Sequence, residues 1–93
     1  MSQVVRQSVT VNLENGLHLV PCSRIAQAAS NYDCDVRILR DDMSVDAKRV
    51  LELMTLNASL GTDLVLEAEG DKAANAVNDL VTLFNANFDG PLD

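Results

Sequence analysis

The chain has 93 residues, of which 47% are hydrophobic and 23% charged, and its formal net charge is −7. This length and composition are those of one globular domain, and the negative charge argues against nucleic acid, whose phosphates bind clusters of Lys and Arg. No apolar run reaches the ~20 residues of a membrane span and the first residues do not resemble a signal peptide, so we expect a cytoplasmic protein without membrane insertion.

The first half of the chain predicts a strand, a helix and a second strand. Residues 4–13 alternate between apolar and polar side chains, which is typical of a strand with one wet face. Asn15-Gly16 breaks this pattern, and residues 19–31 then follow a helical period. Pro21 fits the first helical turn, where its missing N–H has no intrahelical partner to lose. His18 therefore stands at the N-terminus of this helix, and residues 34–40 return to a strand pattern.

The second half predicts two more strands and two more helices. Residues 43–46 form a short return strand, after which Asp46 is placed to cap a short helix over roughly 47–57. Residues 64–69 alternate as a last strand, and a helical stripe that reaches Phe88 follows Gly70-Asp71. The order βαββαβα predicts a two-layer α+β sandwich. We expect a single domain over residues 1–93, with its core at about 4–88 and a frayed tail at 89–93.

Few side chains suit metal or redox chemistry. Cys22 and Cys34 are expected to be reduced thiols, because the chain lacks a secretion signal. With the single histidine, His18, they are too few and too irregularly spaced for a four-ligand zinc site. Cys22 is in phase with the apolar face of the first helix and is expected in the core. We expect neither a metal nor a cofactor.

His18 is the candidate for chemistry. The first N–H groups of a helix are unsatisfied and the helix dipole is positive there, so the position suits a phosphate. A neutral imidazole can be the nucleophile in phosphoryl transfer, which depends mainly on positioning and charge neutralisation. Gly16 would let a partner approach closely, and Pro21 would hold the first turn rigid. The same residues also fit an ordinary turn between a strand and a helix, and their spacing alone does not decide.

The motif N-G-L-H-x-x-P at residues 15–21 follows the first predicted strand and resembles the active-site signature of HPr, the histidine-containing phosphocarrier of the bacterial sugar phosphotransferase system. SNYDCDVRI resembles the start of the family's second strand, and DAKRVLELMTLNASLGTDLVLEAEG resembles its second helix and fourth strand. The resemblance extends over roughly residues 5–88 and includes the order of the elements.

This resemblance implies a carrier phosphorylated on Nδ1 of His18, not an enzyme that turns over a free substrate. A separate enzyme I would supply the phosphoryl group from phosphoenolpyruvate, and a IIA-type component would accept it. The backbone N–H groups of Leu19 and Val20 would bind the phosphate. Asn15-Gly16 and Pro21 would form the frame of the motif. The family also implies an antiparallel four-stranded sheet with three helices on one side, and we expect a monomer.

Two positions depart from the family's pattern. The family has an arginine two residues after the histidine, whose guanidinium helps hold the phosphate, and this chain has Val20 there. Such a charge-assisted contact contributes about 1.5–3 kcal/mol. Arg24 on the first helix and Arg49 at the start of the second are candidate substitutes. Arg49 also occupies the position at which many members carry a serine phosphorylated by a kinase, so we expect no regulatory serine.

The family docks its partners through an apolar patch on the second helix, which corresponds here to Val50, Leu51 and Met54. Because this short helix also carries Leu53 and Leu56, it cannot bury both of its faces. We therefore expect Leu51 and Met54 to be exposed for docking, while Val50 fits the patch and the core equally well.

Three functions follow from these residues. The first is a phosphocarrier that uses His18. The second is an HPr-like regulatory protein that binds partners through the second helix, with weak or no phosphotransfer because of Val20. The third is a small ligand-binding module in which His18 is only a turn residue, which the lack of another polar cluster disfavours.

Overall fold

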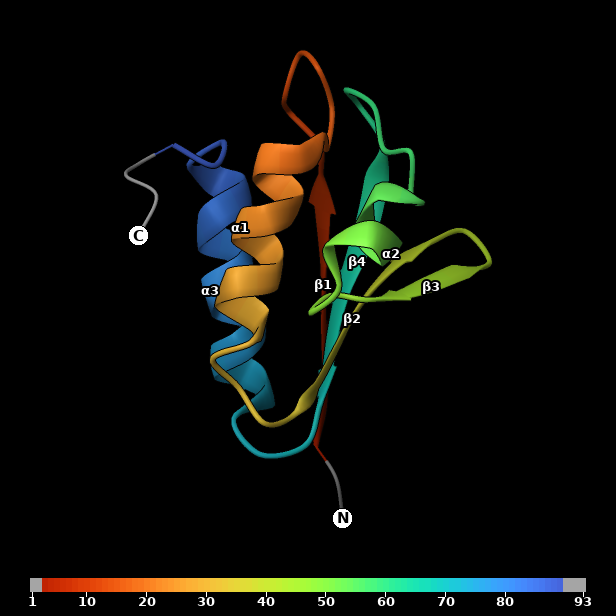
Figure 1. The fold of residues 1–93 in the computed structure, drawn as a ribbon. Coiled ribbons are helices and arrows are strands. Elements are labelled where there is room, and N and C mark those ends of the chain that lie inside the picture. Colours follow the sequence, from red (N-terminus) through yellow and green to blue (C-terminus); the bar gives the residue numbers. More distant parts are fainter. Residues whose placement is uncertain (1–2, 90–93) are drawn as a thin grey trace.

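A four-stranded antiparallel sheet forms one layer of the molecule, and three helices lie against one of its faces (Figure 1). The computed structural model describes residues 3–89. The strands are β1 (Val4–Thr10), β2 (Asp35–Arg40), β3 (Met43–Asp46) and β4 (Asp63–Glu69), in the spatial order β1-β4-β2-β3. The helices are α1 (Leu19–Ala29), α2 (Val50–Met54) and α3 (Ala73–Asn85). This confirms the predicted βαββαβα order and the open-faced sandwich.

The first strand and the last helix end before their predicted bounds because the chain turns earlier than its apolar pattern ends. The first strand ends at Thr10 and not at residue 13. Thr10 pairs with Asp63, the first residue of the partner strand β4. Beyond it, Val11 is buried and exchanges backbone hydrogen bonds with the turn before β4: its N–H donates to the Thr62 carbonyl and its carbonyl accepts from Gly61 N–H. The last helix ends at Asn85, and Phe88 lies beyond it with a left-handed φ of 59°. Its ring still packs edge-on against Phe84, 4.8 Å between centroids.

The prediction that Asp46 caps the second helix is wrong. Asp46 belongs to β3, and its carboxylate accepts a hydrogen bond from the backbone N–H of Lys48. This contact forms a tight turn, so that α2 starts only at Val50, with Arg49 as the residue before it. The helix is therefore shorter than the predicted span of 47–57. The predicted tail, 89–93, lies outside the described residues except for Asp89.

The core lies between the sheet and the helices. Its largest fully buried side chains come from both layers and include Ile25, Ile38, Leu53, Leu56, Leu64, Leu66 and Leu80. Cys22 is also fully buried, as its phase in the helix predicts, and burial raises the pKa of its thiol. This environment keeps Cys22 protonated and makes it a small apolar core residue.

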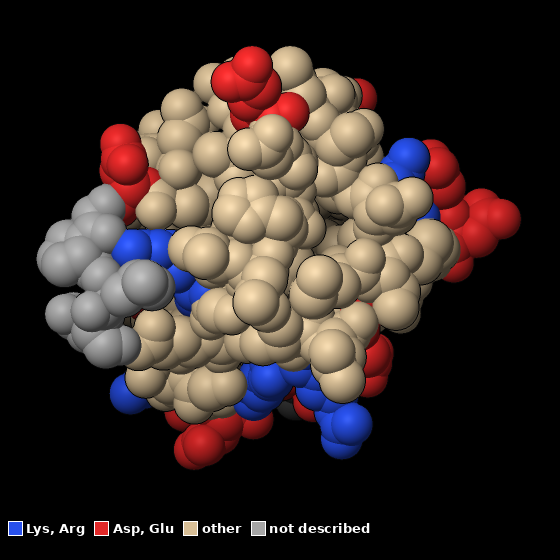
Figure 2. All heavy atoms as spheres, turned by 45° about the horizontal axis from the view of Figure 1, so that its top comes forward, with Lys and Arg blue, Asp and Glu red and all other residues tan. Residues whose placement is uncertain are grey.

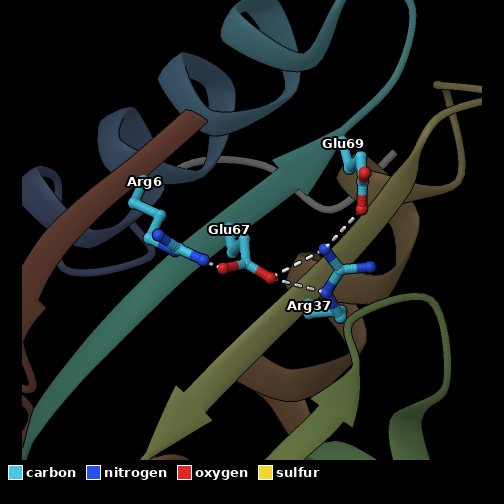
Figure 3. Close-up of polar contacts among 4 residues, drawn as sticks. All are labelled: Arg6, Arg37, Glu67 and Glu69. Carbon is cyan, nitrogen blue, oxygen red and sulfur yellow. Dashed lines mark hydrogen bonds and ion pairs between the residues drawn. The ribbon is translucent and has the colours of Figure 1, made fainter. Parts of the chain in front are cut away.

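Charged side chains are distributed unevenly over the surface. At the end of the molecule where α1 begins, they lie around the rim of a broad uncharged face (Figure 2). On the face of the sheet that no helix covers, four of them form a network across three strands (Figure 3). Glu67 of β4 is only 6% exposed and binds both Arg6 of β1 and Arg37 of β2, and Arg37 also reaches Glu69. Hydrogen bonds from Arg6 and then Arg37 lower the pKa of Glu67.

Candidate functional site

His18 is the residue before the first turn of α1, and its side chain is exposed. Its backbone is extended, its carbonyl accepts the N–H of Cys22 at 3.1 Å, and its ring makes no capping bond to the helix. Pro21 has no N–H to donate, and the N–H groups of Leu19 and Val20 have no partner among the described residues. Two amide donors and the positive end of an eleven-residue helix therefore follow the imidazole directly.

Gly16 fits the loop before His18 closely against residues 58–59. Its φ is +69°, a conformation that L side chains rarely adopt, and a Cβ atom here would lie 2.4 Å from the Ala58 carbonyl oxygen. The next residue, Leu17, donates its N–H to that same oxygen at 2.8 Å. The glycine therefore allows the approach of the chain's own backbone, whereas the sequence interpretation assigned it to the approach of a partner.

The structure brings a second segment to His18 that the motif does not contain. An open hollow beside the imidazole is lined by Asn15, Leu17, His18, Met54, Asn57, Ala58 and Ser59. Met54 is the last residue of α2, and Asn57 has a left-handed φ of 52°. Sequence reasoning missed Asn57 and its neighbours, because they carry no charge and no motif. The only sign in the sequence was that Asn57, a polar residue, follows a short apolar helix, where an asparagine often ends a helix.

Arg40, at the end of β2, holds this second segment in place and was also missed. Its Nη1 donates to the carbonyl oxygens of Leu56 and Asn57, at 2.6 and 2.9 Å. These carbonyls follow the last turn of α2, where a cation is also favoured by the helix dipole. Because Ala58 comes next and contacts the His18 loop, Arg40 links β2 to the hollow beside His18.

The two candidate substitutes for the motif arginine do not line the hollow. Arg49 is largely exposed and forms ion pairs with the carboxylates of Asp46 and Glu52, at 3.5 and 3.8 Å. Arg24 is half-buried on α1, the helix that begins at His18. Val20, at the position of the missing arginine, is 44% exposed. The roles suggested for Arg24 and Arg49 stay predictions.

Exposed apolar side chains surround the hollow. On α2, Leu51 is 81% and Met54 41% exposed, while Val50 is half-buried and packs against the core. Leu19 next to His18 and Leu60 next to Ser59 are each 56% exposed. These residues extend the predicted α2 patch to both sides of the histidine.

Two further searches concern only residues 3–89. No helix there is long and apolar enough to cross a membrane. No group of three or more His, Cys, Asp and Glu side chains is arranged to hold a metal ion in the described part of the chain.

Comparison with known proteins agrees with this fold and identifies the family. The family model for the phosphotransferase-system HPr component phosphorylation site matches residues 5–86. The phosphocarrier protein HPr of Pseudomonas aeruginosa is 38% identical over 82 residues, which cover 87% of this chain and 91% of that protein. The phosphocarrier protein NPr of Klebsiella oxytoca is 31% identical over 86 residues, with coverages of 91% and 96%.

A solved structure gives the same result for the fold. The crystal structure of HPr-C-His from Thermoanaerobacter tengcongensis superposes with a TM-score of 0.88 and 30% sequence identity, covering 95% of this chain and 99% of that one. Fold and site thus define a histidine-containing phosphocarrier of the open-faced sandwich type. The chain belongs to the HPr family of phosphocarrier proteins.

Proposed function

We propose that this protein carries a phosphoryl group on Nδ1 of His18. An enzyme I would transfer the group from phosphoenolpyruvate to His18, and a IIA-type protein would accept it. The observation that carries the proposal is the exposed imidazole at the N-terminus of α1 in a chain of the HPr family. It is followed by the N–H groups of Leu19 and Val20, which have no partner within residues 3–89. The protein would act in the cytoplasm as a monomeric carrier rather than as an enzyme.

The residues of the site have distinct parts in this transfer. The lone pair of the His18 nitrogen attacks the donor's phosphorus, the bond from phosphorus to the donor breaks, and the ring proton passes to the donor. The amides of Leu19 and Val20 and the helix dipole stabilise charge on the phosphoryl oxygens. Pro21 and the close approach of Gly16 to the Ala58 carbonyl keep this frame rigid.

Partner proteins would dock on the apolar surface beside the histidine. The exposures of Leu51 and Met54 support their part in docking, and half-buried Val50 would lie at the edge of the contact. Arg49 stands where a regulatory serine occurs in the family, which supports a carrier without that regulation.

The test is phosphorylation in vitro. The protein is incubated with phosphoenolpyruvate and enzyme I, and intact-mass spectrometry measures the gain of an acid-labile phosphoryl group. We expect wild type to gain the group and the variant His18→Ala to lack it. Arg24→Ala and Arg49→Ala, measured alongside, show whether either arginine replaces that of the motif. Equal behaviour of wild type and His18→Ala would rule out the carrier function.

A regulatory protein without efficient phosphotransfer is the second candidate. It is favoured by Val20, which removes the guanidinium of the motif while the apolar surface on α2 is kept. In that case partner binding would persist in His18→Ala, and wild type would gain little phosphate from enzyme I.

A further inference from the structure

The surface around His18 lacks charged side chains, although Asn15, Asn57 and Ser59 give the hollow a polar part. None of the seven residues that line the hollow beside the imidazole is charged. One of them, Met54, is an exposed large apolar side chain, and Leu19, Val20, Leu51 and Leu60 are exposed on the same segments of the chain. Figure 2 shows the same end of the molecule as an uncharged face with charged side chains around its rim. A phosphoryl group on His18 would therefore lie beside uncharged polar and apolar side chains, with no charged side chain in the hollow.

Most basic side chains of the chain already have partners within it, and one of them, Arg40, binds the Asn57 carbonyl next to the hollow without lining it. Those with a carboxylate or a backbone carbonyl as partner are Arg6, Arg37, Arg40, Lys48 and Arg49. Lys72 lies just before α3, at the opposite end of the molecule from the start of α1 (Figure 1). Arg24 is the one basic residue within α1, and it is half-buried. None of the seven lines the hollow.

Covering this site with a partner raises an electrostatic problem. A phosphoryl group carries about −1.5 to −2 charges near neutral pH. The amides of Leu19 and Val20 supply hydrogen bonds but no net positive charge. When an apolar partner surface excludes water, the charge loses its solvation, and the helix dipole, equivalent to about half a charge, offsets only part of it. Some GTPases solve a similar problem with an arginine supplied by a second protein.

We propose that the docking partner supplies the missing cation. Building on the proposed function, we infer a partner that presents an apolar surface with one Arg or Lys side chain, which enters beside Val20 and contacts the phosphoryl oxygens. The valine leaves room for this side chain and does not repel it. Charge complementarity selects this partner, because an acidic or purely apolar surface would leave the phosphoryl group uncompensated. In this arrangement the cation belongs to the partner protein and not to the carrier. The bonds made and broken in the transfer stay the same.

Two phosphoryl donors distinguish two explanations of Val20. In one, the partner supplies the cation; in the other, the motif arginine is lost and nothing replaces it. Phosphoramidate is a small donor that brings no guanidinium: its P–N bond breaks, ammonia leaves with the ring proton, and the bond from phosphorus to His18 forms. Phosphorylated enzyme I from the same genome is the protein donor. The variants are Val20→Arg, the matched apolar control Val20→Leu, Arg24→Ala and Lys72→Ala. Rates of His18 phosphorylation are measured by intact-mass spectrometry with both donors.

The expected result has opposite signs for the two donors. Val20→Arg accelerates phosphorylation by phosphoramidate about tenfold and slows transfer from enzyme I about tenfold, because two cations then meet at one site. Val20→Leu separates the effect of a larger side chain from that of the added charge, and Lys72→Ala, at the opposite end of the molecule, leaves both rates close to wild type. Acceleration by Val20→Arg with both donors overturns the proposal, as does a tenfold loss with both donors in Arg24→Ala, which would place the cation in this chain. If wild type reacts with neither donor, the proposed function fails as well.

Discussion

Replacing Arg40 by Met tests whether two carbonyl contacts hold the segment beside His18 in place. Methionine keeps most of the apolar stem of the arginine and removes the donors at 2.6 and 2.9 Å from the Leu56 and Asn57 carbonyls. The contact with Leu56 is partly buried and contributes about 1.5 kcal/mol, while the exposed contact with Asn57 contributes about 0.5 kcal/mol. We therefore expect the free energy of unfolding to fall by about 2 kcal/mol.

The assay has a global and a local readout. Urea unfolding followed by circular dichroism measures the free energy, with an unchanged slope if only the folded state is affected. Hydrogen exchange at the Leu17 amide reports on its bond to Ala58, and we expect faster exchange in Arg40→Met. Lys72→Met removes the same charge at the other end of the molecule and serves as the control.

The reasoning about Arg40 fails under one clear outcome. A change in unfolding free energy of less than about 0.5 kcal/mol in Arg40→Met, together with unchanged exchange at Leu17, would mean that the two contacts do not hold this segment. A change of equal size in Lys72→Met would instead assign the effect to net charge.

Three other predictions follow from the same structure. Gly16→Ala combines a left-handed φ with a Cβ atom 2.4 Å from the Ala58 oxygen, so we expect a loss of about 2–4 kcal/mol in urea unfolding, and wild-type stability would contradict the close approach. Glu67→Gln is expected to cost about 1–2 kcal/mol at neutral pH. Because the folded-state pKa of Glu67 is lowered, its stabilisation is present above the ordinary carboxyl pKa of about 4.3 and is lost as pH falls below it, so the difference from wild type should shrink in acid. Leu51→Ser should leave stability within about 0.5 kcal/mol of wild type and weaken binding to enzyme I in calorimetry, whereas Leu53→Ala, at a buried position of the same helix, should cost about 2–5 kcal/mol; unchanged binding in the first would exclude α2 from the docking surface.

The position of His18 was accessible from the sequence, because its determinants are local. The strand pattern stops at Asn15-Gly16, and a helical period with Pro21 in its first turn follows. These two patterns place the histidine at a helix N-terminus without knowledge of any long-range contact. The same local rules gave the order of the elements. They failed at Asp46, whose carboxylate bonds the Lys48 amide, and at Phe88, where packing on Phe84 continues past the end of the helix.

What surrounds His18 was decided only by the tertiary structure. Residues 57–59 come to the histidine because β2, β3 and α2 return the chain to that end of the sheet, and Arg40 and the Ala58 carbonyl hold them there. The open-face network likewise joins residues that are 30 and 61 positions apart in the chain. The sequence by itself placed His18, the residue proposed to carry a phosphoryl group, at a helix N-terminus, with Val20 two residues after it. The side chains around His18, and the lack of charge among those that line the hollow, depend on contacts between distant segments. No local sequence pattern encodes these contacts.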